Sequence, residues 1–390
     1  MNFLLSAGEA SGDNYGAHLM DALRRLAPES AFFGMGGEKM QAAGGELLVH
    51  AKDVAVVGLV EVVRHLPHIR RQFKRMVAEA ARRKPHAAVL VDFPEFNLRL
   101  ARELHRLGIP VFYFVSPQIW AWRSGRVKQV QKYVRKMIVI FPFEQEFYRR
   151  HGVDVTYVGH PLAHAPLPQI SREEFAARHV LDPTEQWIAL LPGSRRKEVR
   201  FNLDAMVSAA WILREQGHDF QFLLPVASTL EKDWLYQQLR SLEWPVPVIL
   251  TDDPRATLKH SRAAVVASGT ATVEAALAGT PFVVVYRVAA LTWLLGRRLV
   301  NLNTFAMPNL ILGKEKRAVP ELIQRDFTAG NIVRELKAII PDGAPRTQML
   351  ADLQEVREKL RDSGYSEAPA VLAAKEILAQ LRRSGDPVIG

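Results

Sequence analysis

Short runs of continuous apolar residues, each followed by a stretch with helical periodicity, most constrain what this chain can fold into. Runs such as "AAVLVD" (87–92) and "PVFYFV" (110–115) lack the alternation of a strand with one face in water. They are typical of parallel strands that are buried on both faces. Because such strands alternate with helices, the sequence predicts an α/β protein built on open, doubly wound parallel sheets.

The strand–helix pattern occurs twice along the 390 residues, which are too many for one ordinary core. In the first series, strands are expected at 2–7, 30–34, 87–92, 110–115, 136–140 and 154–158, and helices at 14–27, 66–83, 95–107 and 142–151. A proline-rich stretch at 159–171 looks like a linker to the second series. We expect two Rossmann-like domains facing across a cleft, at 1–165 and 172–345, with C-terminal helices at 346–390 packing back on the body.

The composition narrows the class of protein. Cysteine is absent, which excludes disulfides and thiolate metal sites. The opening "MNFLLSAGEASGD" lacks the basic region of a signal peptide, and no apolar run approaches the ~20 residues of a membrane-spanning helix. Histidines are scattered, without metal-binding spacing beside an acid. We therefore expect a cytoplasmic protein with no metal site and no cofactor.

The net charge of +10 is concentrated in the first half, especially in "RHLPHIRRQFKRMVAEAARRK" (64–84). Such a helix suits an anionic membrane surface, a phosphorylated substrate or nucleic acid. An ordinary solvated basic helix would carry the same pattern. The residues that we expect to form a membrane face are Arg70, Arg71, Lys74 and Arg75.

Two strand-to-helix turns in the second half suit a nucleoside diphosphate. In "LLPGSRRKEV" (190–199) and "ASGTATVEAAL" (267–277), a buried strand ends at a glycine-containing turn and a helix follows. Helix N-termini attract anions, and an arginine fork can hold a phosphate with two hydrogen bonds. Each turn alone could be an ordinary capped turn, but two in one half favour a nucleoside diphosphate site. Its candidate residues are Gly193, Ser194, Arg195, Ser268, Gly269, Thr270 and Glu274.

In the first half, Asp92 emerges from a buried strand and is a candidate general base, although it could equally cap a helix. Glu95 follows Pro94 and is more typical of a cap. The stretch "FLLSAGEASGDNYGAHL" (3–19) starts as a strand and ends as a helix, but the spacing of its glycines does not fit a dinucleotide turn. Trp120 and Trp122 share a loop where they could contact a sugar or acyl chains, or simply pack.

Seven motifs together resemble lipid-A-disaccharide synthase, a family of inverting glycosyltransferases with the two-Rossmann (GT-B) architecture. They run from Ser6 to about residue 325 and read "AGEASGD", "VDFPEFN", "VSPQIWAWR", "VGHPL", "LLPGSRRKEV", "ASGTATVEAAL" and "MPNLILG". The resemblance implies that UDP-2,3-diacylglucosamine donates its sugar to the 6-hydroxyl of 2,3-diacylglucosamine 1-phosphate (lipid X). The products would be the β-1,6-linked lipid A disaccharide 1-phosphate and UDP.

The resemblance also implies roles for single residues. Asp92 matches the family's base, Arg195 its "PGSR" arginine and Asn309 its "PN" asparagine. Many relatives carry aspartate where this chain has Glu95, which leaves open whether Glu95 shares the role of base. The residues implied on the acceptor side are Glu9, Ser11, Gly12, Asp13, Gln118 and Trp120.

Lipid substrates give the basic helix a purpose. We expect peripheral association with the anionic inner membrane through residues 54–84, with 291–300 as a second contact. The length of the C-terminal helices also suggests packing between domains or in a homodimer. Two rival enzymes on the same scaffold stay open, namely a UDP-sugar 2-epimerase and a transferase for another lipid acceptor. Nucleic-acid binding rests on charge alone, so we expect no nucleic acid partner.

Overall fold

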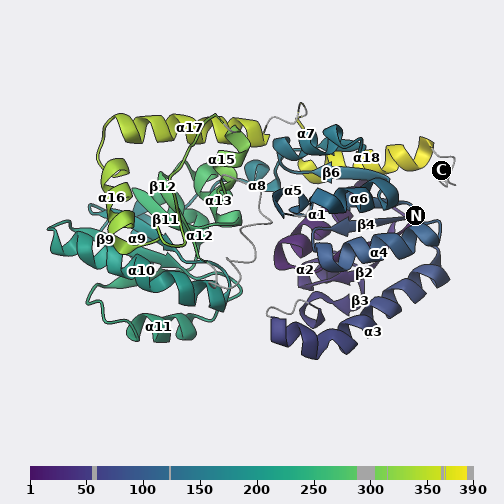
Figure 1. Ribbon diagram of the computed structural model, residues 1–390, viewed down its shortest axis with the longest axis horizontal. Coiled ribbons are helices and arrows are strands. Elements are labelled where there is room, and N and C mark those ends of the chain that lie inside the picture. The colour runs from purple at the N-terminus through teal and green to yellow at the C-terminus, as the bar shows by residue number, and fades with distance from the viewer. Residues whose placement is uncertain are drawn as a thin grey trace. The chain divides into compact units, whose positions relative to one another are not determined.

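The computed structural model describes residues 1–54, 59–122, 124–287, 304–313, 315–361, 364 and 366–383, with 59–64, 121, 122 and 124 described by their backbone alone. The chain forms two compact units (Figure 1). The first contains Met1–His164 together with Leu360–Gly390, and the second contains Ala165–Lys359. The C-terminal helices are therefore divided between the two units.

The first unit is built on a seven-stranded parallel sheet with the order β3-β2-β1-β4-β5-β6-β7. Its strands are β1 (Asn2–Ala7), β2 (Ala31–Gly36), β3 (Glu46–His50), β4 (Ala87–Val91), β5 (Val111–Phe114), β6 (Lys136–Val139) and β7 (Val155–Tyr157). In the register of the central strands, Leu4 lies beside Phe33 on one side and Ala88 on the other. The direction of winding reverses between β1 and β4, which creates the ligand-binding position of such sheets.

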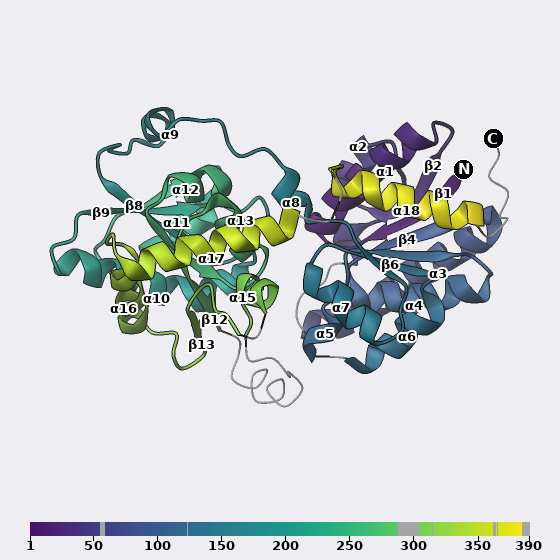
Figure 2. The ribbon, with the colours of Figure 1, turned by 90° about the horizontal axis from the view of Figure 1, so that it is seen from above.

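Helices cover both faces of this sheet. They are α1 (Ala10–Leu26), α2 (Glu38–Ala42), α3 (Leu59–Arg83), α4 (Pro94–Arg106), α5 (Ile119–Trp122), α6 (Val127–Tyr133), α7 (Pro142–Arg150), α8 (Pro161–His164) and α18 (Pro369–Arg383), with 3₁₀ turns at Ala51–Asp53 and Ser124–Arg126. Leu4 and Leu90 pack toward α3, α4 and α6, whereas Phe3 and Leu5 pack toward α1 and α18. Figure 2 shows α18 lying along α1.

The second unit repeats the design with a six-stranded parallel sheet in the order β10-β9-β8-β11-β12-β13. Its strands are β8 (Gln186–Leu191), β9 (Phe220–Pro225), β10 (Val248–Thr251), β11 (Ala263–Ala267), β12 (Phe282–Tyr286) and β13 (Glu321–Ile323). Here the winding reverses between β8 and β11, so this sheet has its own ligand-binding position.

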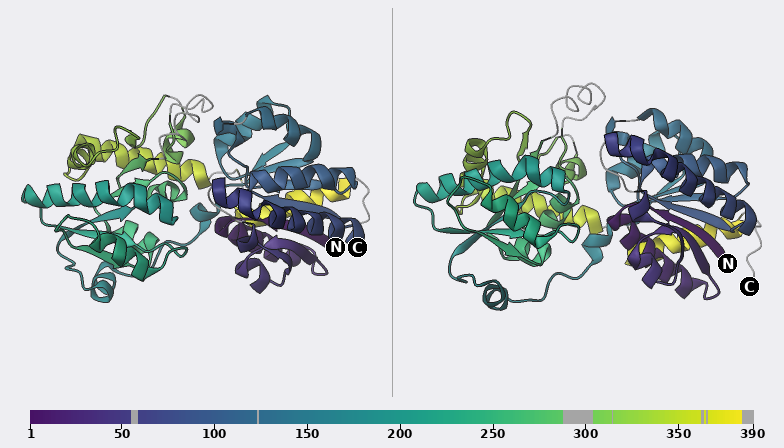
Figure 3. Two further views of the ribbon diagram at one scale, coloured as in Figure 1. Left: turned by 60° about the horizontal axis from the view of Figure 1, so that its bottom comes forward. Right: turned by 90° about the horizontal axis from the view of Figure 1, so that it is seen from below.

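Helices again cover both faces of the second sheet, as the two views of Figure 3 show. They are α9 (Arg172–His179), α10 (Arg196–Glu215), α11 (Lys232–Arg240), α12 (Pro254–His260), α13 (Thr270–Ala278), α15 (Met307–Leu312), α16 (Ala329–Ile339) and α17 (Ala344–Arg361). One core joins the sheet to α10 and α11, and another joins it to α9 and α12.

The predicted fold class is confirmed, since both halves are doubly wound parallel α/β units. Several elements were not predicted, among them β3, β13, α9 and α16. Helix α1 begins at Ala10, whereas the sequence predicted a start at 14. The prediction was late because the first turn "ASGD" has a turn-like composition and Glu9 provides no side-chain cap. Among the described residues, no helix is both long enough and apolar enough to cross a bilayer.

Candidate functional site

Asp92 lies at the point where the winding of the first sheet reverses, directly after β4. Its φ is +46° and that of Phe93 is +50°, a left-handed conformation that is strained in residues other than glycine. Val115, directly after β5, has a φ of +63°, and its carbonyl accepts a hydrogen bond from the Asp92 N–H at 3.2 Å. Backbone strain is thus present at the ends of two neighbouring strands.

Two buried side chains hold the strained turn. The Asp92 carbonyl accepts hydrogen bonds from the Tyr113 hydroxyl at 2.6 Å and from Asn97 Nδ2 at 2.9 Å. Asn97 also accepts a hydrogen bond from Ser6 Oγ at 2.6 Å, which ties the end of β1 to the same turn. A Cβ at Gly8 would collide with the ring of Phe93, so the first glycine of "AGEASGD" is needed for this packing.

The acidic residues near the turn have different surroundings. Asp13 is buried and accepts three backbone N–H groups, from Gly37 at 2.6 Å, Lys39 at 3.0 Å and Met40 at 3.1 Å. It therefore caps α2 and fixes the preceding glycine-rich turn. Glu95, in the first turn of α4, is exposed and forms an ion pair with Arg126 at 2.9 Å.

The remaining acceptor-side candidates follow β1 and β5. Glu9 occupies the N-cap position of α1, Ser11 is exposed in its first turn, and Gly12 lies where a Cβ would make ordinary contacts with Ala7 and Val91. Gln118 is exposed in the loop after β5. The side chain of Trp122 lies outside the described residues.

Trp120 is docked on the first turn of α7. Its Nε1 donates a hydrogen bond to Glu144 Oε1 at 3.1 Å. Its ring contacts that of Phe143 edge to face, with centroids 4.8 Å apart. Sequence reasoning missed Glu144, because an acid in the first turn of "PFEQEFYRR" is also the pattern of an ordinary helix start.

Burial controls the charge of Glu144, which is only 2% exposed. Loss of solvation raises its pKa to about 8, and the nearby charge of Asp92 adds to the effect, while the hydrogen bond from Trp120 opposes it. The carboxyl group is therefore mostly protonated at neutral pH. Burial likewise lowers the pKa of His160, in the "VGHPL" motif, to about 3, so this imidazole is neutral.

In the turn after β8, backbone and side-chain donors bond to one carboxylate, that of Glu198. Glu198 Oε2 accepts hydrogen bonds from the backbone N–H of Ser194 at 3.0 Å and of Arg195 at 3.3 Å, and Arg195 Nη1 donates to Oε1 at 3.3 Å. Gly193 has a φ of +121°. Asn202 fixes the turn from beneath by donating to the Pro192 carbonyl at 2.8 Å. These donors are the groups that a phosphate would require.

The turn after β11 lies at the same edge of the second sheet. Gly269 has a φ of +144°, and the space beside its Cα is open. Ser268 Oγ donates to the Phe305 carbonyl at 3.1 Å, and Thr270 is exposed at the start of α13. Glu274 is partly buried, and this burial raises its pKa, against the lowering effect of Arg255.

Asn309 is buried, and both the nitrogen and the oxygen of its side-chain amide form hydrogen bonds. Its Nδ2 donates to the Val319 carbonyl at 2.9 Å and to Glu321 Oε1 at 2.7 Å, and its Oδ1 accepts from the Val319 N–H at 3.0 Å. Glu321 also accepts from the Phe305 N–H at 2.7 Å. Asn309 and Glu321 therefore hold the segment to which Ser268 is bonded. Glu321, on an unpredicted strand, was missed by sequence reasoning.

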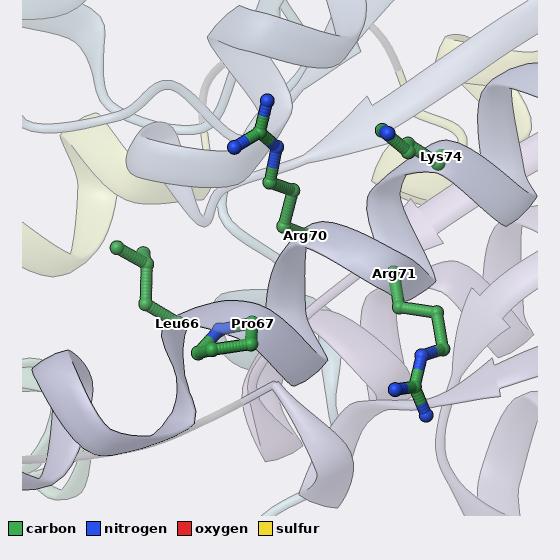
Figure 4. A pocket seen from close by; sticks show the side chains of 5 residues that line it. All are labelled: Leu66, Pro67, Arg70, Arg71 and Lys74. Carbon is green, nitrogen blue, oxygen red and sulfur yellow. The ribbon is translucent and has the colours of Figure 1, made fainter.

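The four predicted membrane-face residues lie on one exposed stretch of α3. Leu66, Pro67, Arg70, Arg71 and Lys74 line a surface hollow there (Figure 4). Arg75 is exposed beside them, whereas Ile69, Phe73 and Val77 pack against the core. Residues 55–58 and the second expected contact at 291–300 lie outside the described residues. No group of three or more acidic or histidine side chains in the described part of the chain could hold a metal ion.

Comparison with known proteins gives the family. The family model described as lipid-A-disaccharide synthetase matches residues 3–375. The chain belongs to this family. It is 54% identical over 384 residues to the lipid-A-disaccharide synthase of Koribacter versatilis (strain Ellin345). The matched residues cover 98% of this chain and 99% of that protein. The corresponding protein of Acidobacterium capsulatum is 50% identical, over 98% of this chain and 97% of its own length.

Solved structures of low sequence identity share the fold. The calicheamicin glycosyltransferase CalG4 matches with a TM-score of 0.58 at 17% identity, over 98% of this chain and 99% of that protein. The UDP-GlcNAc 2-epimerase of Neisseria meningitidis, bound to UDP-GlcNAc, matches with a TM-score of 0.60 at 12% identity, over 98% and 100%. Both glycosyltransferases and epimerases therefore use this two-unit architecture.

The protonated state of Glu144 predicts a pH-dependent effect on stability. The unfolded chain releases this proton near pH 4.5, whereas the native protein keeps it up to about pH 8, so the group's contribution to stability falls as pH rises between these values. The slope is at most about 1.4 kcal/mol per pH unit. Replacement of Glu144 by Gln removes the titration, so the variant should gain stability relative to wild type between pH 5 and pH 8.

Urea unfolding of the wild type and of Glu144→Gln at several pH values measures this difference. Glu146→Gln, on the exposed side of the same helix, is the control for simple loss of a negative charge. A difference between wild type and Glu144→Gln that stays constant from pH 5 to pH 8 would contradict the assignment.

Proposed function

We propose that the protein transfers the sugar of UDP-2,3-diacylglucosamine to the 6-hydroxyl of lipid X, with inversion at the anomeric carbon. The products are the β-1,6-linked disaccharide 1-phosphate and UDP. The observation that carries the proposal is membership of the lipid-A-disaccharide synthetase family over residues 3–375. The polar groups at the reversal points of both sheets support it, since ligands of such sheets bind there.

In the proposed reaction, Asp92 is the general base. It takes the proton of the 6-hydroxyl as this oxygen forms its bond to the anomeric carbon of the donor. The bond from that carbon to the UDP oxygen breaks, and UDP leaves with the electron pair. The bonds from Tyr113 and Asn97 to the Asp92 carbonyl support the assignment, because they hold the strained turn in one conformation. We do not assign the base to Glu95, because it is exposed in the first turn of α4 and is directed to Arg126, whereas Asp92 lies in the strained turn itself.

The second unit is proposed to bind UDP. The N–H groups of Ser194 and Arg195, with the Arg195 guanidinium, would stabilise the charge that develops on the leaving diphosphate. The open space at Gly269 and the hydroxyl of Thr270 suit close approach of a phosphate, and Glu274 would accept from the ribose hydroxyls. We propose that Asn309 acts by holding this region in place, since its amide is fully engaged by Val319 and Glu321.

We propose that Glu9, Ser11, Gln118 and Trp120 contact the acceptor, and that Asp13 and Gly12 shape the turn behind them. The first four follow β1 or β5, at the same sheet edge as Asp92. Charge neutralisation by arginine and backbone donors leads us to expect catalysis without added metal.

We further propose that the enzyme works at the cytoplasmic face of the inner membrane, through the basic face of α3. Both substrates carry acyl chains, and peripheral binding combines apolar insertion with attraction to anionic lipid. Leu66, which is 51% exposed, supplies an apolar group to the surface hollow that Arg70 and Arg71 also line.

Replacement of Asp92 by Asn should lower disaccharide formation about a hundredfold, as expected for loss of a general base. UDP-2,3-diacylglucosamine and lipid X are mixed in detergent micelles, with and without EDTA, and the products are followed by mass spectrometry. Glu95→Gln is the matched control and should stay within about threefold of wild type. An unaffected Asp92→Asn would move the base elsewhere. Absence of disaccharide, with turnover of UDP-N-acetylglucosamine alone, would favour an epimerase instead.

Replacement of Arg70, Arg71, Lys74 and Arg75 together by Gln should weaken binding to anionic vesicles about a thousandfold, because each of the four basic residues near such a surface contributes about 1 kcal/mol. Flotation with phosphatidylglycerol vesicles measures the bound fraction. A variant with four other exposed basic residues of the same unit changed to Gln, namely Lys128, Lys132, Arg149 and Arg150, is the control of equal charge. Equal loss in both variants would contradict a specific membrane face.

A further inference from the structure

Glu144 lies at the same edge of the first sheet as Asp92. Strands β4, β5 and β6 are neighbours and parallel, so their carboxyl ends meet at one edge. Asp92 follows β4, and Glu144 belongs to the first turn of α7, after β6. The segment 115–120, here called the loop although it includes the start of α5, follows β5. The loop that carries Trp120 thus lies between the candidate base and a buried carboxyl group.

Both oxygens of the Glu144 carboxyl group are used. Oε1 accepts from Trp120 Nε1 at 3.1 Å, and Oε2 accepts from the Phe141 N–H at 3.3 Å. Ser116, at the start of the same loop, lowers the pKa of this carboxyl group and so opposes the effect of burial. Because Glu144 is buried, loss of one of these partners would leave a polar group unsatisfied away from water, which is energetically unfavourable.

The loop is held at both ends. At its start, the Val115 carbonyl accepts from the Asp92 N–H, and Ser116 Oγ lies 2.8 Å from the Tyr148 hydroxyl. At its end, the Trp120 indole is fixed by Glu144 and by the edge-to-face contact with Phe143. A partly exposed indole that is fixed in this way is a preorganised surface for the apolar face of a sugar.

We propose that Glu144 is a positioning residue for the acceptor, which it serves by fixing the Trp120 indole beside Asp92. Glu144 does not touch the reacting atoms and acts through Trp120. This inference rests on the proposed function, because it assigns the acceptor to the loop after β5. In its protonated form Glu144 adds no second negative charge near the base.

The test separates positioning from direct chemistry by measuring KM for each substrate. Trp120→Phe keeps an aromatic ring and removes the N–H donor, whereas Glu144→Leu removes the acceptor of that hydrogen bond. Each should raise KM for lipid X about tenfold, with KM for the UDP-sugar unchanged and kcat within about threefold. Since both changes break the same contact, the double variant should be no worse than the more affected single variant.

Glu144→Gln keeps an oxygen that can accept from Trp120 and should restore KM for lipid X to within about threefold of wild type. Glu146→Gln is the control on the same helix. KM values for lipid X that stay within twofold of wild type in both Trp120→Phe and Glu144→Leu would overturn the inference, as would effects that simply add. A wild-type enzyme that forms no disaccharide would instead overturn the proposed function itself.

Discussion

Burial of parallel strands on both faces is the constraint on which the rest of this structure depends. Strands such as β4 and β11 are apolar along their whole length, so they are stable only between two layers of helices. Parallel direction brings all the carboxyl ends of a sheet to one edge, and the backbone must turn there into a helix. Polar side chains and helix N-termini collect at this edge because the interior of the sheet admits neither.

The two units use this edge in different ways. In the first, the turn at Asp92 and Phe93 has left-handed backbone in two consecutive residues that are not glycine, and buried bonds from Asn97 and Tyr113 hold it. Because these bonds hold the strained turn in one conformation, they also fix the direction in which the Asp92 side chain leaves the backbone. In the second unit, Gly193 and Gly269 adopt their positive φ without that cost, and backbone N–H groups provide the donors. One edge therefore suits a base, and the other suits an anion.

Sequence reasoning found the features that local pattern determines. Uninterrupted apolar runs identified most strands, and the glycine-containing turns at Gly193 and Gly269 are where the pattern placed them, after β8 and β11. It missed β3, because this edge strand has only two buried residues and lacks a strong apolar run. It also missed Glu144 and Glu321, since an acid becomes a buried hydrogen-bond acceptor only when distant segments close over it. The left-handed turn at Asp92 depends on Tyr113, a residue of another strand, so local sequence does not specify it.

The most direct test of the division between the units is hydrogen–deuterium exchange of the whole protein with UDP and with lipid X in separate samples. UDP alone should slow exchange in peptides that contain Ser194, Arg195 and Gly269, and lipid X alone should slow exchange in peptides that contain Ser11 and Trp120. This result would agree with a nucleotide site on the second sheet and an acceptor site on the first. Protection by UDP that is confined to the peptides around Ser11 and Asp92 would contradict the account.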